Sequence, residues 1–440
     1  MYNNLKTFFI YTLGCKVNQY ESQWMRQSLE KAGLRPAADD EIADIYIINS
    51  CTVTATADKK SMQAVRRFKQ INPEGIVVLT GCMPQAAPDK KDFSPADIIM
   101  GNKTNIDIVK NISSFTGTKL MDISPHKMGD EYIRQSVSSF GEKTRAEIKI
   151  EDGCNRFCTY CLIPYARGRV RSRPVDDIVK EAYCLAKNGY KEIVLVGINL
   201  SAYCYEEKGL ADVVEEIGKV EGIERIRLGS LEPDHLTREV IHKLSLQRKL
   251  CPQFHISLQS GCDATLKRMN RHYTASEYFA LCQALREKFT DCTLTTDVMV
   301  GFPGETQEDF NESLEFIKLC KFEKVHIFPY SRRKGTPADK YENQVSQSEK
   351  ARRAKIMAEV AGRIREECLK SMLGSRVSVL TQEYNDGFTF GYTPNYTPVY
   401  IKGKIETGII VNIQINEFFG DMEALSGTVL SFCDCQAEEK

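Results

Sequence analysis

The chain has 440 residues, of which 42% are hydrophobic and 27% charged, a composition typical of a globular protein with about three domains. Its 59 basic and 59 acidic residues cancel, which excludes a uniformly basic nucleic-acid-binding protein but not a local basic face. No apolar run approaches the ~18 residues of a membrane span, and the N-terminus lacks a signal-peptide layout. We therefore expect a cytoplasmic protein with reduced thiols and no membrane association.

Short apolar runs alternate with helical patterns over the first hundred residues, which predicts a parallel sheet covered by helices. We expect this first domain to span residues 1–120, followed by a polar, aperiodic linker at 121–142. The predicted strands are Thr7–Leu13, Ile45–Asn49, Gly75–Thr80 and Ile98–Met100, and the predicted helices are Gln19–Ala32 and Thr56–Gln70.

A second alternating series predicts a partial (β/α)6 barrel over residues 143–370. Helical patterns lie between most of its strands, and a long charged helix over Ser346–Leu373 ends it. The six predicted strands are Ala146–Ile150, Glu192–Val196, Arg225–Gly229, Phe254–Leu258, Leu294–Val300 and Lys324–Tyr330. The predicted helices between them include Pro174–Asn188, Leu210–Val220, Ser276–Lys288 and Thr306–Cys320.

The last segment, residues 371–435, changes to short β-rich pieces separated by turn residues, which predicts a small antiparallel barrel. The fold class is thus α/β with a C-terminal β-barrel. From residue 371 onward the chain has four basic and nine acidic residues, so bulk charge would not attract RNA there. The predicted strands are Val377–Thr381, Phe388–Thr393, Val399–Lys402 and Ile409–Ile415.

Three cysteines, Cys154, Cys158 and Cys161, directly follow the first predicted barrel strand. Three thiolates at this spacing can hold one 4Fe–4S cluster and leave one iron open for another ligand. A zinc knuckle would require two Cys pairs or added His residues, and a redox dithiol would leave Cys154 without a role. The spacing therefore favours an iron–sulfur site.

A second set, Cys15, Cys51 and Cys82, is spread along the N-terminal domain, each residue just past the end of a predicted parallel strand. The carboxyl ends of parallel strands share one edge, where ligands bind. We expect a second three-thiolate cluster there, the alternative being three buried structural cysteines. The other ten cysteines, including the pair Cys433 and Cys435 near the end of the chain, are expected not to be ligands.

This order of motifs resembles the radical S-adenosylmethionine (SAM) methylthiotransferases. The loop from Cys154 to Cys161 resembles the SAM-binding cluster motif, the upstream triad resembles the auxiliary-cluster domain, and Phe390–Tyr396 resembles part of a TRAM domain, a tRNA-binding module. The resemblance implies two 4Fe–4S clusters and two uses of SAM. One SAM methylates a sulfur associated with the auxiliary cluster. The other is cleaved to a radical that removes hydrogen from carbon 2 of an adenine, to which the methylthio group is transferred.

The wording of the first motif separates the branches of that family. The run from Gly14 to Glu21, Gly-Cys-Lys-Val-Asn-Gln-Tyr-Glu, resembles the branch acting on N6-threonylcarbamoyladenosine at position 37 of tRNA, as do Ile163–Gly168 and Phe328–Ser331. One departure is Met83-Pro84, since the family more often has Ala before Gln85. The alternatives are isopentenyladenosine, a ribosomal protein or, in another class, a non-catalytic metal-stabilised RNA-binding protein.

Polar and basic residues supply the remaining expected contacts. Four alternating arginines after the second cysteine loop predict phosphate contacts with the anticodon stem-loop: Arg167, Arg169, Arg171 and Arg173. Two weaker basic patches are Lys267-Arg268 with Arg271-His272, and Arg332-Arg333-Lys334. By resemblance alone, the tail would contact tRNA through Tyr392, Asn395, Tyr396, Lys402 and Lys404.

Polar residues at the predicted strand ends of the barrel are candidates for the SAM pocket. We also expect a monomer that takes electrons from a protein such as a flavodoxin or ferredoxin. The pocket candidates are Gly197, Asn199, Ser230, Glu232, Gln259, Ser260 and Asp297.

Overall fold

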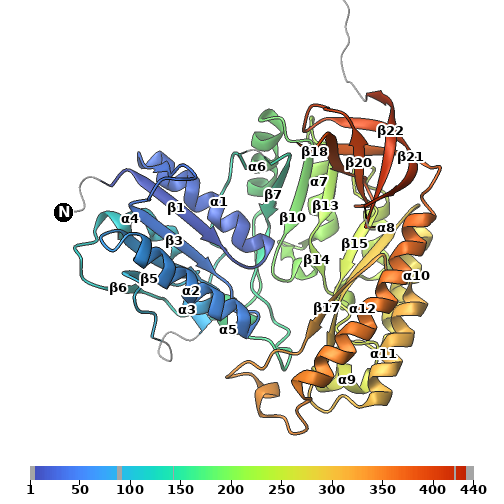
Figure 1. The fold of residues 1–440 in the computed structure, drawn as a ribbon, viewed down its shortest axis with the longest axis horizontal. Helices are drawn as coiled ribbons and strands as arrows, with labels where there is room; N and C mark the ends of the chain where they lie inside the picture. The colour runs from blue at the N-terminus through green and yellow to red at the C-terminus, as the bar shows by residue number, and fades with distance from the viewer. Residues whose placement is uncertain (1–4, 87–91, 142, 421–422, 433–440) are drawn as a thin grey trace, which may run out of the picture.

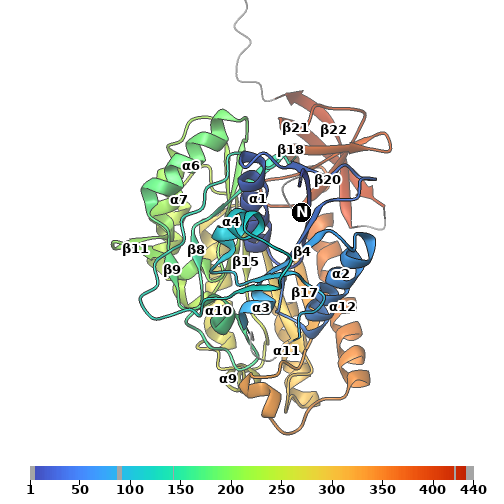
Figure 2. The same ribbon diagram turned by 90° about the vertical axis from the view of Figure 1, so that its left-hand side faces the viewer.

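The computed structural model describes residues 5–86, 92–141, 143–420 and 423–432. It contains an N-terminal α/β unit, a central partial barrel and a C-terminal β-barrel, and both outer units lie against the central one (Figures 1 and 2). Across the described ranges, no helix is long and apolar enough to cross a membrane.

The N-terminal unit is one fully parallel six-stranded sheet in the order β2-β1-β3-β4-β5-β6. Its central strands are buried on both faces, which explains why they read as continuous apolar runs. Helices α1 and α4 pack on one face and α2 on the other. The elements are β1 (Thr7–Thr12), α1 (Lys16–Lys31), β2 (Arg35–Pro36), β3 (Ile45–Ser50), α2 (Ala55–Ile71), β4 (Ile76–Gly81), α3 (Cys82–Ala86), β5 (Ile98–Met100), α4 (Ile108–Ser113) and β6 (Leu120–Asp122).

The segment expected to be a linker packs closely on the protein. Its first residues belong to β6, and Val137 and Phe140 are buried in the core of the central barrel. The hydroxyl of Tyr132 donates to the carbonyl of Lys149 at 2.8 Å. The segment is polar in composition because only a few of its side chains face the core.

The central unit has the six parallel strands that the sequence predicts. The third is interrupted at Gly229 into β13 and β14, so the strands form two adjoining sheets, β7-β10-β13 and β14-β15-β16-β17. The strands are β7 (Arg145–Lys149), β10 (Glu192–Val196), β13 (Arg225–Leu228), β14 (Ser230–Leu231), β15 (Gln253–Ile256), β16 (Thr293–Val300) and β17 (Lys324–Pro329).

Helices cover the outside of this barrel, and the long α12 runs beside α11 along one side (Figure 1). Two hairpin-like pairs, β8 with β9 and β11 with β12, decorate it. The helices are α5 (Ile163–Arg167), α6 (Val175–Lys187), α7 (Leu210–Gly218), α8 (Arg238–Ser245), α9 (Asp263–Arg268), α10 (Ala275–Lys288), α11 (Gln307–Cys320) and α12 (Gln347–Lys370); the short strands are β8 (Glu151–Asp152), β9 (Arg171–Ser172), β11 (Cys204–Tyr205) and β12 (Lys208–Gly209).

The C-terminal unit is a closed five-stranded barrel in the order β18-β19-β20-β22-β21. It is not fully antiparallel as expected, because β20 and β22 pair in parallel. A closed ring with an odd number of strands cannot alternate direction throughout, so one pair must be parallel. The strands are β18 (Arg376–Asn385), β19 (Phe388–Tyr392), β20 (Pro398–Lys402), β21 (Ile410–Phe419) and β22 (Ala424–Phe432). The α/β class with a C-terminal barrel is confirmed.

Candidate functional site

The structure brings Cys15, Cys51 and Cys82 together at one edge of the N-terminal sheet, beyond β1, β3 and β4. Gly14 permits this approach: its φ is +106°, and an added Cβ would lie 2.8 Å from the Cβ of Cys51. Burial raises the pKa of Cys51 and raises that of Cys82 to about 12, and the neighbouring thiols add to both shifts. A thiolate here therefore requires a positively charged partner.

The second triad lies in the loop between β8 and α5. The amide N–H of Cys161 donates to the carbonyl of Cys158 at 3.0 Å, and Phe157 adopts a left-handed φ of +49° that tightens the turn. Burial raises the pKa of Cys154 to about 12, and Cys158 adds to the shift. The two cysteine loops are linked through α3 and α5, which pack against each other. Cys433 and Cys435 lie outside the described residues.

Five of the six sulfurs accept an N–H hydrogen bond. Such bonds stabilise a negatively charged sulfur and are typical of cysteines that hold iron–sulfur clusters. In the described ranges, no three donor side chains surround one point closely enough for a single metal ion. The donors are Val53 N to Cys51 (3.5 Å), Arg167 Nε and Asn102 Nδ2 to Cys82 (3.2 and 4.0 Å), Arg156 N and Asn199 Nδ2 to Cys154 (3.5 and 3.9 Å), Arg271 Nη1 to Cys158 (3.4 Å) and Ile163 N to Cys161 (3.4 Å). The donor chemistry fits a cluster at each triad.

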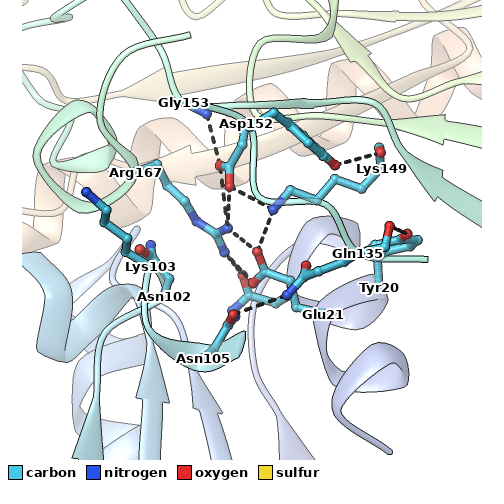
Figure 3. Close-up of polar contacts among 12 residues, drawn as sticks. Tyr20, Glu21, Asn102, Lys103, Asn105, Gln135, Lys149, Asp152, Gly153 and Arg167 are labelled. Carbon is cyan, nitrogen blue, oxygen red and sulfur yellow. Dashed lines mark hydrogen bonds and ion pairs between the residues drawn. The ribbon is translucent and has the colours of Figure 1, made fainter. Parts of the chain in front are cut away.

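Arg167 connects the two units at the first triad (Figure 3). Besides Cys82, its guanidinium contacts both carboxylate oxygens of Glu21, at 2.5 and 2.9 Å, and the amide oxygen of Asn18 at 2.8 Å. The amide group of Asn18 in turn donates to the backbone carbonyls of Leu13 and Ser50, at 2.8 and 2.9 Å. One arginine from the barrel thus fixes the loops that carry Cys15 and Cys51.

The same network is fully buried and holds an excess of positive charge. Lys149 donates to Glu21 and to Asp152, each at 2.7 Å, while Arg171 lies 3.6 Å from Asp152. Burial would raise the pKa of Glu21, but Arg167 and Lys149 outweigh burial and lower it. Three cations therefore face two carboxylates, which leaves an excess of positive charge beside the sulfur of Cys82.

The burial of these arginines corrects the predicted RNA contacts. The side chains of Arg167 and Arg173 are 0% and 1% exposed, and that of Arg171 is 6% exposed. Arg173 pairs with Glu181 of α6, and Arg171 donates to two backbone carbonyls within its own loop. These three side chains serve internal ion pairs and hydrogen bonds, so they are not available to phosphates. Only Arg169 is exposed.

The candidates for the SAM pocket come from both sheets of the barrel, Gly197 and Asn199 after β10 and Gln259 and Asp297 from the region of β15 and β16. Asn199 lies beside Cys154, and its buried Oδ1 has no hydrogen-bond partner among the described residues. Gly197 is required next to Glu151, because an added Cβ would lie 2.7 Å from a carboxylate oxygen. Burial raises the pKa of Glu151 to about 8.

In the second sheet, Gln259 and Asp297 come from neighbouring strand regions. The amide N–H of Gln259 donates to the carbonyl of Asp297 at 2.8 Å, and Gln259 adopts a left-handed φ of +67°. The carboxylate of Asp297 lies 3.2 Å from Nε2 of His255. Two other candidates are already engaged within the protein. Glu232 pairs with Arg271, and Ser260 forms a hydrogen bond with Ser313.

The residues of the C-terminal unit that were expected to contact tRNA are divided between two surfaces. Tyr392 and Tyr396 stack on each other with centroids 4.3 Å apart, and Arg145 of the central barrel lies over both rings. Asn395 is buried. These three therefore form an interface between units, which corrects the expectation for them. The exposed residues of this set are Lys402 and Lys404.

The weaker basic patches are also largely engaged within the protein. Arg268 pairs with Asp309, and Arg332 pairs with Asp339, in each case with a carboxylate oxygen within 2.6 Å. Arg333 reaches across to the N-terminal unit, where it binds Asp58 at 2.8 Å. These contacts explain the arginines without invoking a nucleic acid.

Sequence reasoning missed the roles of four residues that contact or orient the cysteines, and it named one of them, Arg271, only as part of a basic patch. Asn18 and Glu21 lie in the quoted motif, which was interpreted only as a marker of substrate. The other two, Asn102 and Arg271, approach the cysteines from distant parts of the chain, and no spacing signal in the sequence connects them.

Two family models match the chain: "Radical SAM superfamily" over residues 148–317 and "Uncharacterized protein family UPF0004" over residues 7–101. A threonylcarbamoyladenosine tRNA methylthiotransferase MtaB from Chlamydia pneumoniae is 39% identical, with 86% of this chain and 87% of the relative covered. The MtaB of Bacillus subtilis is 38% identical over 86% and 85%. A tRNA-2-methylthio-N(6)-dimethylallyladenosine synthase from Clostridium tetani is 37% identical over 86% of each chain.

A solved structure of similar fold is the radical S-adenosylmethionine methyltransferase TsrM from Kitasatospora setae, with a TM-score of 0.53 and 15% identity. The match covers 76% of this chain and 77% of TsrM, which shows a shared fold. Membership of a family follows from the relatives that are more than 30% identical over most of the chain. The chain belongs to the radical SAM tRNA methylthiotransferases, enzymes whose cofactors are SAM and two 4Fe–4S clusters.

Proposed function

We propose that this enzyme attaches a methylthio group to carbon 2 of N6-threonylcarbamoyladenosine at position 37 of cytoplasmic tRNA, giving 2-methylthio-N6-threonylcarbamoyladenosine. The observation that carries the proposal is the pair of cysteine triads, which two packed units bring to one interface. The loop of Cys15, with Lys16 and Asn18, supports the choice of nucleoside through its resemblance to the threonylcarbamoyl branch, whose named relatives are 35 to 39% identical.

In this proposal, Cys154, Cys158 and Cys161 hold the cluster that binds SAM, and Cys15, Cys51 and Cys82 hold the auxiliary cluster. When bound, these cofactors supply the radical and the sulfur that replacement of an inert aromatic hydrogen requires. Gly197, Asn199, Gln259 and Asp297 line the SAM pocket. The functional units are residues 1–120, 143–370 and 371–435.

The chain's own contribution is to position the cofactors and to exclude water. Arg167 and Arg271 each hold an N–H on a cysteine sulfur, which favours the thiolate form that a metal ligand must take. The packing of α1 on β10 through Val17, Val194 and Val196 keeps the two units in register. Close, dry placement of the reacting groups is what a radical transfer requires.

We propose that the enzyme acts as a monomer on the anticodon stem-loop and receives electrons from a small protein such as a flavodoxin or ferredoxin. A base in an anticodon loop is cheaply unstacked, which suits an enzyme that must reach carbon 2. Arg169, Lys402 and Lys404 are the exposed members of the predicted contact set.

The test is nucleoside mass spectrometry on the anaerobically reconstituted protein with SAM, a reductant and tRNA carrying either threonylcarbamoyl- or isopentenyladenosine. We expect the methylthio mass increment on the threonylcarbamoyl nucleoside. An increment only on the isopentenyl nucleoside would keep the chemistry and overturn the substrate. That second substrate is favoured by the relatives named as dimethylallyladenosine synthases, which are 34 to 37% identical.

A further inference from the structure

A hollow of about 920 Å³ lies where the three units meet. Lys16 lines it from the start of α1, Arg145 and Glu147 from β7, and Gln382 from β18. Because Lys16 directly follows Cys15, the hollow begins one residue from the first triad. A group bound in this hollow would therefore lie beside the site proposed to supply the sulfur.

Two residues that line this hollow each hold a buried polar atom that has no partner within the described residues. The two atoms are Oε2 of Glu147, a residue that is 8% exposed, and Nε2 of Gln382. An unsatisfied buried polar group costs free energy, so such groups are rare unless a ligand or water completes them. Here one is an acceptor and the other a donor, which matches a ligand that carries both a hydroxyl or N–H group and a carbonyl.

The hollow also favours negative charge, because its three basic residues, Lys16, Lys143 and Arg145, outnumber its two acidic ones, Glu147 and Glu383. In the described part of the chain, no carboxylate lies within ion-pair distance of Lys16. The ion pair of Arg145 with Glu192 is long, with 3.8 Å between Nη1 and Oε1. Tyr396 reports the resulting potential. Its burial would raise its pKa, but Arg145, Lys16 and Arg227 outweigh burial and lower it. Of these cations, Lys16 and Arg145 line the hollow, and a carboxylate entering it would meet both of them.

We infer that this hollow binds the N6-substituent of the target adenosine and selects a substituent that carries a carboxylate. Lys16 and Arg145 bind the carboxylate, Glu147 accepts from a hydroxyl or ureido N–H, and Gln382 donates to a carbonyl. This inference rests on the proposed function. A hydrocarbon substituent would leave Lys16 and the buried atoms of Glu147 and Gln382 without partners, and sites built for hydrogen bonds discriminate strongly against such analogues.

The experiment uses the full, anaerobically reconstituted enzyme and three anticodon stem-loops. They carry threonylcarbamoyladenosine, its carboxylate methyl ester, or isopentenyladenosine at the same position. The variants are Lys16→Met, Lys16→Arg and Glu147→Gln, with Lys110→Met on the exposed face of α4 as the matched control. The rate of methylthio product formation gives kcat/KM. Two further measurements, SAM cleavage in the absence of product and iron content, report the state of the clusters.

We expect the wild-type enzyme to lose roughly 10- to 100-fold in kcat/KM when the carboxylate is esterified, the range for a charged hydrogen bond. Lys16→Met should lower kcat/KM on the acid by a similar factor, and it should lower kcat/KM on the ester only slightly. Lys16→Arg should recover part of the loss on the acid. Glu147→Gln should lower kcat/KM by a similar factor on the acid and on the ester. SAM cleavage and iron content should not change.

Equal use of the acid and the ester by the wild-type enzyme would overturn the inference and leave the proposed function intact. So would a Lys16→Met variant that lowers kcat/KM equally on both. Failure of the proposed function is a separate outcome, in which the wild-type enzyme makes no methylthio product from the acid. The comparison of acid and ester uses the wild-type protein, so it tests the inference even if a variant folds poorly.

Discussion

At the scale of single residues, Arg167 shows how one side chain serves two units. Its backbone belongs to the segment after the second cysteine loop, while its guanidinium binds Glu21, Asn18 and Cys82 of the N-terminal unit. A charged hydrogen bond to a sulfur stabilises the more negative, reduced form of a cluster held there. Arg167 is therefore a positioning residue with an electrostatic effect.

Replacing Arg167 with Met should lower the reduction potential of the auxiliary cluster. A charged hydrogen bond of about 1.5–3 kcal/mol corresponds to a shift on the order of 60 to 130 mV for one electron. Potentiometry followed by electron paramagnetic resonance would measure it in a background where Cys154, Cys158 and Cys161 are Ala. Arg169→Met is the control from the exposed position of the same segment, and an equal potential in both variants would contradict the assignment.

A second residue-scale prediction concerns Glu323 at the start of β17. Burial raises its pKa to about 7, although Arg365 at 3.6 Å opposes the shift. The native state thus keeps a proton that the unfolded chain releases near pH 4.3, so stability falls as the pH rises from there to about 7. Glu323→Gln should gain on the order of 3 kcal/mol over wild type at pH 7.5 and about half of that at pH 5.5.

Thermal denaturation at the two pH values, monitored by circular dichroism, measures this difference. The matched control is Glu315→Gln on the exposed face of α11, where the carboxylate pairs with Lys318 in solvent. We expect no pH-dependent gain from the control. A gain of the same size at both pH values would mean that Glu323 does not hold its proton in the native state.

A residue's role could be predicted where the local sequence determines it, and could not where it depends on tertiary contacts. The cysteines were recognisable because local spacing marks one triad and strand ends mark the other. The arginines were not, because a run of alternating Arg looks the same whether it faces solvent or a carboxylate. Arg173 is buried by Glu181 and Tyr20, which lie on different helices, and that meeting depends on tertiary structure.

At the scale of elements, the parallel sheet explains why three cysteines that are distant in sequence lie at one edge. The strand positions were predictable from apolar runs, whereas β22 was not, since the consecutive residues Ser426, Gly427 and Thr428 interrupt its apolar residues. Short helices such as α3 and α5 also lack a full period of hydrophobic residues. These two nevertheless pack together and link the cysteine loops.

Replacing Cys15, Cys51 and Cys82 together with Ala should separate the two triads. Iron should fall from about eight to about four per chain, because each cluster holds four. SAM cleavage should persist while the methylthio product disappears. Iron analysis and nucleoside mass spectrometry measure the two effects. Methylthiolated tRNA from this triple variant would show that the first triad is not the auxiliary site, and Ala at Cys154, Cys158 and Cys161 should abolish both activities.

At the scale of the whole molecule, buried charges join the units alongside apolar contacts. Glu21 from α1 pairs with Arg167 and Lys149 from the central unit, and Arg227 of the barrel donates to a backbone carbonyl of the C-terminal unit. Burying ions is costly unless each has its partner, so docking in the wrong register is disfavoured. The charges thus specify how the units fit.

Glu21→Gln should therefore loosen the N-terminal unit from the barrel. It leaves Arg167 and Lys149 without a full counter-charge, a cost of about 3 to 5 kcal/mol for a broken buried pair. Hydrogen exchange read by mass spectrometry should show faster exchange in α1 and in the loop after β7, with the C-terminal barrel unchanged. Glu30→Gln, an exposed position on the same helix, is the control and should exchange like wild type.

The guanidinium over Cys82 also sets an order of biogenesis. The three N-terminal cysteines are complete by residue 82, but Arg167 leaves the ribosome 85 residues later. Once it arrives, Cys82 is 3% exposed and closed beneath it. The sheet edge is thus open at Cys82 only until the barrel docks, and in the folded chain Cys15 is the member of this triad that stays exposed.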